Sequence, residues 1–114
     1  MKEFLILLRG GAEARKASSP EEMQAHMQRW GAWMQKQSEN GTLVGGLPLS
    51  AEGKQVSGGG KVITDGPYTE GKEVIVGYLI IKAADLKAAA AISQGCPFNE
   101  HHGVLEVREI TAMM

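Results

Sequence analysis

Cysteine, aromatic residues and runs of like charge are all scarce in this chain of 114 residues. Its single cysteine, Cys96, excludes an intrachain disulfide. The 12 basic and 13 acidic residues are scattered and leave a net charge of −1, which argues against a nucleic-acid partner. The apolar run near the N-terminus covers residues 4–8, whereas a secretory signal core needs about 7–15 residues and a membrane span about 20. We therefore expect a cytoplasmic protein with neither a nucleic-acid nor a membrane partner.

The length fits one domain over residues 1–114, with one modest core. Within it, apolar patterning predicts an alternation of strands and helices. The predicted strands cover residues 4–8, 42–49, 61–64, 74–82 and 103–110, with a short additional strand near 55–56 and a turn at 65–68. The predicted helices run from Ser19 to about Asn40 and from Asp85 to about Ile92.

Both helices carry end signals in the sequence. Ser19 and Glu22 have the spacing of a capping box, and Gly41 is placed for a left-handed cap at the end of the first helix. Asp85 is the predicted N-terminal cap of the second helix, and Gly95 ends it. The pair Gly45-Gly46 weakens the strand at 42–49 and predicts a bulge there.

The first helix predicts an apolar stripe, because Met23, Met27, Trp30 and Met34 recur at helical spacing. Trp33 lies off this stripe. We expect Trp33 to be half exposed and to line a ligand pocket between helix and sheet, although a tryptophan on such a helix is also typical of a core residue.

The predicted order of elements is typical of an α+β, ferredoxin-like βαββαβ plan with an inserted hairpin. Two helices cover only one face of such a sheet. The strand at 74–82 nevertheless carries Val76, Tyr78 and Ile80 on one face and Leu79 and Ile81 on the other. Monomers rarely expose a large apolar patch. The sequence therefore predicts a homodimer in which a second sheet covers the open face.

The segment 65–73, Asp-Gly-Pro-Tyr-Thr-Glu-Gly-Lys-Glu, followed by Gly77-Tyr78, resembles the DGPF signature of the YCII-related family. Tyr68 stands where the family usually has Phe, and Gly71 where Thr is common. The resemblance spans nearly the whole chain and implies a dimeric α/β barrel of ferredoxin-like subunits. More distant members carry a His–Asp pair with an implied catalytic role. His26 falls near the position of that histidine, and no acidic residue of this sequence matches its partner.

Asp65 and His26 are the candidate catalytic residues. Asp65 ends a predicted strand at a tight turn, where a carboxylate reaches a cleft at the rim of the sheet. Alternatively, its side chain bonds the amides of its own turn. Tyr68 and Glu70 follow as candidate ligand-binding residues, although the charges around Glu70 are also typical of a solvated loop. His26 has the alternative role of a partly buried helix residue.

Metal ligands are not arranged in any familiar spacing. His101 and His102 are adjacent, so they face opposite sides in an extended chain, and no two histidines stand four apart on a helix. Cys96 follows a helix rather than preceding one, which favours a packing role over a reactive thiolate. We therefore predict neither a metal nor a cofactor.

These observations favour a homodimer that binds a small molecule in a pocket between the sheet and the first helix, near Asp65. General acid–base chemistry without a cofactor is the enzymatic function that these residues suggest. Two other interpretations remain open: a non-enzymatic regulatory or protein-interaction module, and a purely structural dimer. A concave pocket in which Asp65 and Tyr68 converge would favour the first.

Overall fold

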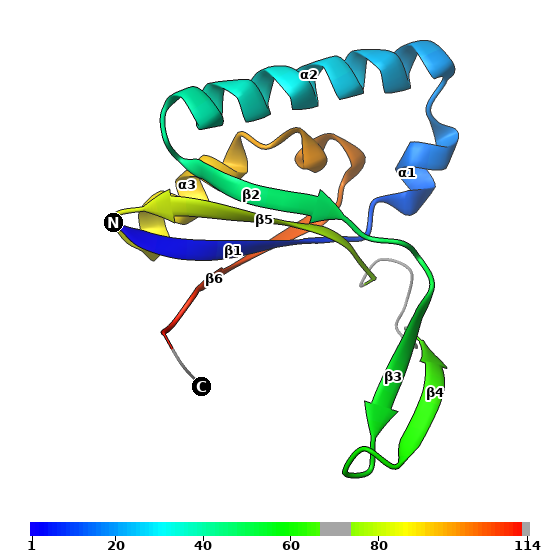
Figure 1. Ribbon diagram of the computed structural model, residues 1–114. Helices are drawn as coiled ribbons and strands as arrows, with labels where there is room; N and C mark the ends of the chain where they lie inside the picture. The colour runs from blue at the N-terminus through cyan, green and yellow to red at the C-terminus, as the bar shows by residue number, and fades with distance from the viewer. Residues whose placement is uncertain (67–73, 113–114) are drawn as a thin grey trace.

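The computed structural model of the protein describes residues 1–66 and 74–112, and Figure 1 shows their arrangement. In chain order, the elements are β1 (Lys2–Arg9), α1 (Ala12–Ala17), α2 (Pro20–Glu39), β2 (Leu43–Pro48), β3 (Gly53–Ser57), β4 (Val62–Gly66), β5 (Ile75–Ala83), α3 (Leu86–Gln94), the 3-10 helix η2 (Pro97–His101) and β6 (Val104–Glu109). No helix in these two described ranges is long and apolar enough to cross a membrane.

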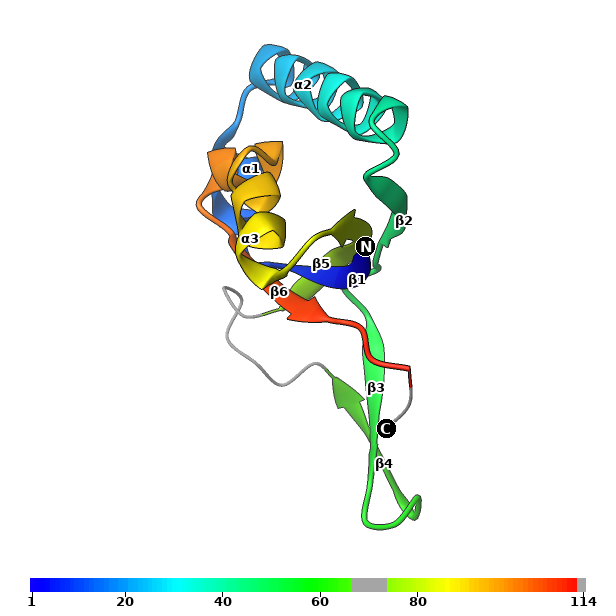
Figure 2. The ribbon, with the colours of Figure 1, turned by 90° about the vertical axis from the view of Figure 1, so that its left-hand side faces the viewer.

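Four antiparallel strands form the main sheet in the order β2-β5-β1-β6. This is the ferredoxin-like order, with β3 and β4 inserted as a separate two-stranded hairpin. The predicted fold class and the predicted hairpin are therefore confirmed. The helices lie on one side of the sheet, and the hairpin projects away from them (Figures 1 and 2).

The core lies on the helix side of the sheet, because alternate residues of the two central strands point there. Phe4 and Ile6 of β1 pair with Ile81 and Leu79 of β5, and all four are buried. The helical side of the core is completed by Ala89, Cys96 and Phe98.

The opposite face of the sheet has no helix over it (Figure 2). Leu5 and Leu7 of β1 are half-buried there, opposite Ile80 and Tyr78 of β5, and Leu47 of β2 extends the row and is exposed. The sequence predicted burial on both faces of β1 and β5. Within one chain only the helix-side face is fully buried, because the elements that pack on the sheet all come from one side.

The helix ends form as predicted. Ser19 Oγ accepts a hydrogen bond from the Glu22 amide, and the Glu22 side chain accepts one from the Ser19 amide. Gly41 has a φ of 74°, in the left-handed region, and terminates α2. Asp85 caps α3 through the amide of Ala88. The predicted bulge is also present, as a register shift between Leu43 and Gly45.

The predicted apolar stripe of α2 is wrong at Met27, and the buried centre of the helix shifts to His26; Met23, Trp30 and Met34 are half-buried. Met27 is 60% exposed, whereas His26 is only 4% exposed. Trp30 and Trp33 continue the His26 face and pack against the core. The shift arises because α2 faces η2, an element that the sequence did not predict, and His26 bonds Glu100 of η2.

Asp65 is not a turn residue, contrary to the prediction. It lies inside β4, opposite Lys54 of β3, because the hairpin ladder continues to the pair Gly53 and Gly66. The later residues of the predicted turn, including Tyr68, lie outside the described residues.

Candidate functional site

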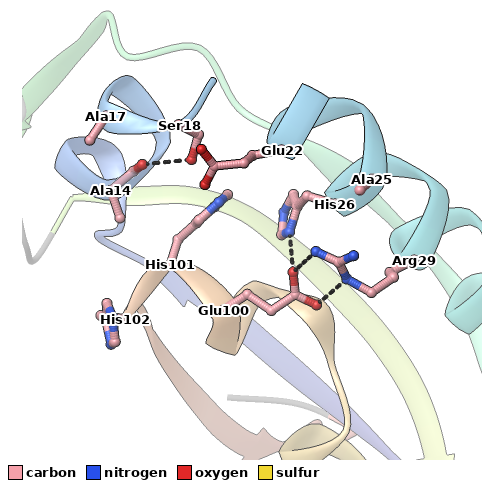
Figure 3. A pocket seen from close by; sticks show the side chains of 10 residues that line it. All are labelled: Ala14, Ala17, Ser18, Glu22, Ala25, His26, Arg29, Glu100, His101 and His102. Carbon is pink, nitrogen blue, oxygen red and sulfur yellow. Dashed lines mark hydrogen bonds and ion pairs between the residues drawn. The ribbon is translucent and has the colours of Figure 1, made fainter. Parts of the chain in front are cut away.

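A pocket of about 540 Å³ opens between α1, α2 and η2 (Figure 3). Its walls combine small apolar side chains with a cluster of titratable ones. The lining residues are Ala14, Ala17, Ser18, Glu22, Ala25, His26, Arg29, Glu100, His101 and His102.

The centre of this cluster is a hydrogen bond between His26 and Glu100. His26 Nδ1 lies 2.9 Å from Glu100 Oε1, and the imidazole is almost completely buried. Arg29 donates two hydrogen bonds to the same carboxylate, from Nε to Oε2 at 2.8 Å and from Nη2 to Oε1 at 2.7 Å. Such a bidentate pair fixes the orientation of the carboxylate as well as its charge.

Glu100 is ionised at neutral pH. The hydrogen bonds from Arg29 and then from His26 lower the pKa of its carboxyl group from 4.5 to about 2. An ionised carboxylate only accepts hydrogen bonds, so the hydrogen between it and His26 belongs to His26 Nδ1. In the neutral ring, Nε2 then carries the free lone pair. This arrangement gives His26 the tautomer and orientation of a general base.

His101 packs directly against His26. The two ring centroids are 4.1 Å apart, with the ring planes tilted by 37°. His101 Nδ1 is buried and has no hydrogen-bond partner among the described residues. Burial above all, and then the neighbouring His26 and Arg15, lower the pKa of His101 below its usual 6.5. His101 is therefore neutral at neutral pH.

Local sequence explains how these side chains meet. His26 and Arg29 stand three residues apart and therefore share one face of α2. Glu100 and His101 are carried by η2, which Asn99 anchors to the end of α3 through bonds to the carbonyls of Ser93, Gln94 and Cys96 at 3.1, 3.2 and 2.9 Å.

Gly103 lets η2 approach β1. A Cβ on Gly103 would lie 2.2 Å from Phe98 Cε2 and 2.9 Å from the Arg9 carbonyl oxygen. Glycine is therefore required in the connection between η2 and β6. This connection fixes the positions of Glu100 and His101 relative to α2.

The structure separates the two predicted catalytic residues. Asp65 lies on the hairpin, where its side chain is 80% exposed and forms an ion pair with Lys54. It lines a different hollow of about 490 Å³, with Glu52 and Gly53, away from the helices (Figure 1). The His26 pocket and this hollow share no lining residue among the residues that the structure describes.

Of the predicted ligand-binding residues, the structure describes Trp33, which does not line the His26 pocket. Trp33 is half-buried and packs edge-to-face on Trp30, with ring centroids 6.0 Å apart. Tyr68 and Glu70 lie outside the described residues. Cys96 is buried in the core, and burial raises the pKa of its thiol to about 11. Among the described residues, no group of three or more His, Cys, Asp or Glu side chains is placed to hold a metal ion.

The family profile of the YCII-related domain matches residues 4–114. The chain belongs to the YCII-related family. Among solved structures, it is similar to 5-chloro-2-hydroxyhydroquinone dehydrochlorinase from Burkholderia phenoliruptrix AC1100, in complex with 2,5-dihydroxybenzoquinone. The match has 15% identity and a TM-score of 0.48, over 96% of this chain and 93% of that chain. No curated protein sequence matches significantly.

Sequence reasoning on this YCII-related chain missed Glu100 and Arg29, and it assigned no role to His101. The sequence offered no acidic partner for His26, yet Glu100 fills that position from 74 residues away. No local spacing signals a contact of that range. Arg29 stands three residues after His26 on the same helix face. This cationic side chain was a local signal that a carboxylate could pair with that face.

Proposed function

We propose that this YCII-related domain is a cofactor-independent enzyme that moves a proton on a small substrate, with His26 as general base. The observation that carries the proposal is the buried His26 whose Nδ1 is held 2.9 Å from the ionised Glu100. A base held in one tautomer by a carboxylate is a recurring arrangement in proton-transfer catalysis.

In this proposal each group has a defined task. His26 Nε2 takes a proton from the substrate, and the Nδ1–H bond to Glu100 stabilises the imidazolium that results. Nε2 exchanges its proton with solvent and then gives a proton back to the product, so His26 ends the cycle neutral. Arg29 keeps Glu100 charged and oriented. The small side chains of Ala14, Ala17 and Ala25 leave space for the substrate.

We further propose that the working unit is a homodimer. The row formed by Leu5, Leu7, Tyr78, Ile80 and Leu47 supports this, because it leaves apolar surface open on the face without helices. The role predicted for Asp65 requires this second copy, because the hairpin holds Asp65 outside the pocket of its own chain.

A protein-interaction module is the second candidate function, and the hairpin is the observation that favours it. Val56 and Ile63, opposite each other on β3 and β4, are 64% and 68% exposed. Isolated two-stranded hairpins are marginally stable in water, so this hairpin would gain stability from a partner. Proton-transfer activity that depends on His26 would favour the enzyme over this alternative.

The test is proton exchange catalysed by the purified protein. Small phenols, lactones and carbonyl compounds with acidic C–H groups are incubated in D₂O, and deuterium incorporation is followed by NMR. His26→Asn keeps an N–H near the position of Nδ1, and so the bond to Glu100, but removes the Nε2 lone pair. We expect exchange to fall by about 100-fold or more, the usual contribution of a general base.

Gln28→Ala is the matched control, since Gln28 is exposed on the same helix and does not line the pocket. It should exchange substrates at the wild-type rate. If a compound is processed equally by His26→Asn and by wild type, the proposed function is wrong.

A further inference from the structure

His101 is the titratable group of the pocket that the proposed proton transfer leaves without a task. Its side chain lines the pocket beside His26 (Figure 3). The residue is only 8% exposed, and its Nδ1 is buried without a partner among the described residues. A buried polar atom without a hydrogen-bond partner costs stability, so the unpaired Nδ1 of His101 calls for an explanation.

The location of the hydrogen on His101 follows from this burial. A neutral imidazole carries one N–H and one lone pair. Buried N–H groups without an acceptor are rarer than unfilled acceptors. Since Nδ1 has no acceptor nearby in the described structure, it holds the lone pair and Nε2 carries the hydrogen. Burial above all, and then the neighbouring His26 and Arg15, lower the pKa of the ring and keep it neutral, against the opposing effect of Glu100.

The two neighbouring histidines therefore present different groups at Nε2. His26 offers a lone pair at Nε2, because Glu100 takes its Nδ1–H. His101 offers an N–H at Nε2, because its other nitrogen is buried. A proton acceptor and a hydrogen-bond donor thus stand on rings 4.1 Å apart. Two rings this close can contact a substrate whose acidic C–H and carbonyl oxygen are separated by one carbon atom.

We propose that His101 is a second catalytic residue, which donates a hydrogen bond from Nε2 to a carbonyl oxygen, and that the substrates are small carbonyl compounds with an acidic C–H next to that carbonyl. The inference rests on the proposed function of His26. In the step, His26 Nε2 takes the proton and the C–H electron pair forms a C=C bond. The carbonyl π pair moves to oxygen, and the enolate oxygen accepts the bond from His101.

The reaction closes without any further reagent. His26 returns a proton that has exchanged with solvent, either to the same carbon or, in a conjugated substrate, to another carbon, and the oxygen regains its double bond. A neutral histidine is suited to the donor role, because it stabilises the enolate by a hydrogen bond and retains its proton.

The test uses three variants of His101 in the D₂O exchange assay, with small ketones and lactones as the probes. Gln places an N–H where His has Nε2, Asn places one only near Nδ1, and Phe keeps the ring without nitrogens. We expect His101→Gln to stay within about tenfold of wild type. His101→Asn and His101→Phe should lose about 100-fold or more, as when an oxyanion donor is removed. Equal rates for Gln, Asn and Phe variants would overturn the donor role.

A second measurement needs no substrate. In ¹⁵N-imidazole NMR of the whole protein at pH 7.5, His101 should be neutral with its hydrogen on Nε2. A hydrogen on Nδ1, or a charged ring, overturns the inference. The failures of the two proposals can be distinguished. If His26→Asn exchanges slowly while His101→Phe exchanges at the wild-type rate, only the role of His101 is wrong. An unimpaired His26→Asn removes the proposed function itself.

Discussion

Glu100 is the residue on which the site depends, because it contacts both His26 and Arg29. One of its oxygens accepts from His26 and from Arg29, and the second accepts from Arg29 alone. Removing its charge would leave the Arg29 guanidinium without its counterion and the buried His26 imidazole with a weaker acceptor. Buried polar groups that lose a partner are costly, so we expect Glu100 to matter for stability as well as for orientation.

The free energy of unfolding should depend on pH in the acid range because of the Glu100 carboxylate. Its pKa in the fold is about 2 against 4.5 for an ordinary glutamate, so the unfolded chain binds the proton first. The stabilising contribution is therefore complete above pH 4.5 and is lost as the pH falls towards 2. Urea unfolding of wild type and Glu100→Gln at pH 6, 4 and 3 measures it. We expect wild type to be more stable at pH 6 and the difference to shrink at pH 3.

A difference between the two proteins that stays constant across this pH range would contradict the pairing. Glu13→Gln is a suitable control. Glu13 lies in the first turn of α1 and makes no ion pair recorded among the described residues, so its substitution should leave the pH profile unchanged.

At the scale of elements, the parts of the fold set by local chemistry were predictable. The capping box at Ser19, the cap at Asp85 and the left-handed Gly41 each act within a few residues, and all three form as expected. The apolar runs at 4–8 and 74–82 likewise predicted two strands, and β1 and β5 form there.

The missed elements depend on contacts that are distant in sequence. η2 is held by Asn99 against the end of α3 and by the close approach of Gly103 to Arg9. Once η2 is placed, Glu100 holds His26 on the buried face of α2, and Met27 is left exposed. The prediction was wrong at Met27 because the partner of α2 could not be read from α2 alone. The sequence identified His26 as a candidate residue but did not identify its carboxylate partner, Glu100.

The position of η2 can be tested with two glycines. Gly103→Ala should destabilise the protein by about 1–3 kcal/mol, since the added methyl would meet the buried Phe98 ring and the Arg9 carbonyl. Gly31→Ala, in α2 with open space around it, should instead stabilise by up to about 1 kcal/mol through helix propensity. Urea or thermal unfolding measures both. Equal effects of the two substitutions would show that Gly103 does not fix η2.

At the scale of the whole molecule, one chain leaves two apolar surfaces open. The first is the sheet face that carries Leu7 and Tyr78, and the second is the hairpin with Val56 and Ile63. The sheet face is continuous across three strands, which makes it the natural contact for a second sheet. The hairpin projects from the main sheet on the side away from the helices (Figure 2).

Light scattering at micromolar concentration should therefore give about twice the chain mass of 12.2 kDa. Leu7→Glu places a charge in the middle of the proposed contact and should give a monomer. Leu86→Glu is the matched control, because Leu86 is an exposed leucine at the start of α3, on the helix side of the sheet. A wild-type monomer, or a Leu7→Glu variant that remains a dimer, would rule out the sheet contact.

The central claim, that His26 is held with its Nε2 free for proton transfer, is tested most directly by locating one hydrogen. Two-bond ¹H–¹⁵N NMR of the uniformly labelled protein distinguishes the two ring nitrogens, and His26→Asn assigns the signal. The account predicts a hydrogen on Nδ1 of His26, with Nε2 unprotonated in the neutral ring, and loss of this preference in Glu100→Gln. A neutral His26 with its hydrogen on Nε2 would contradict the account, because the ring would then have no base to offer the pocket.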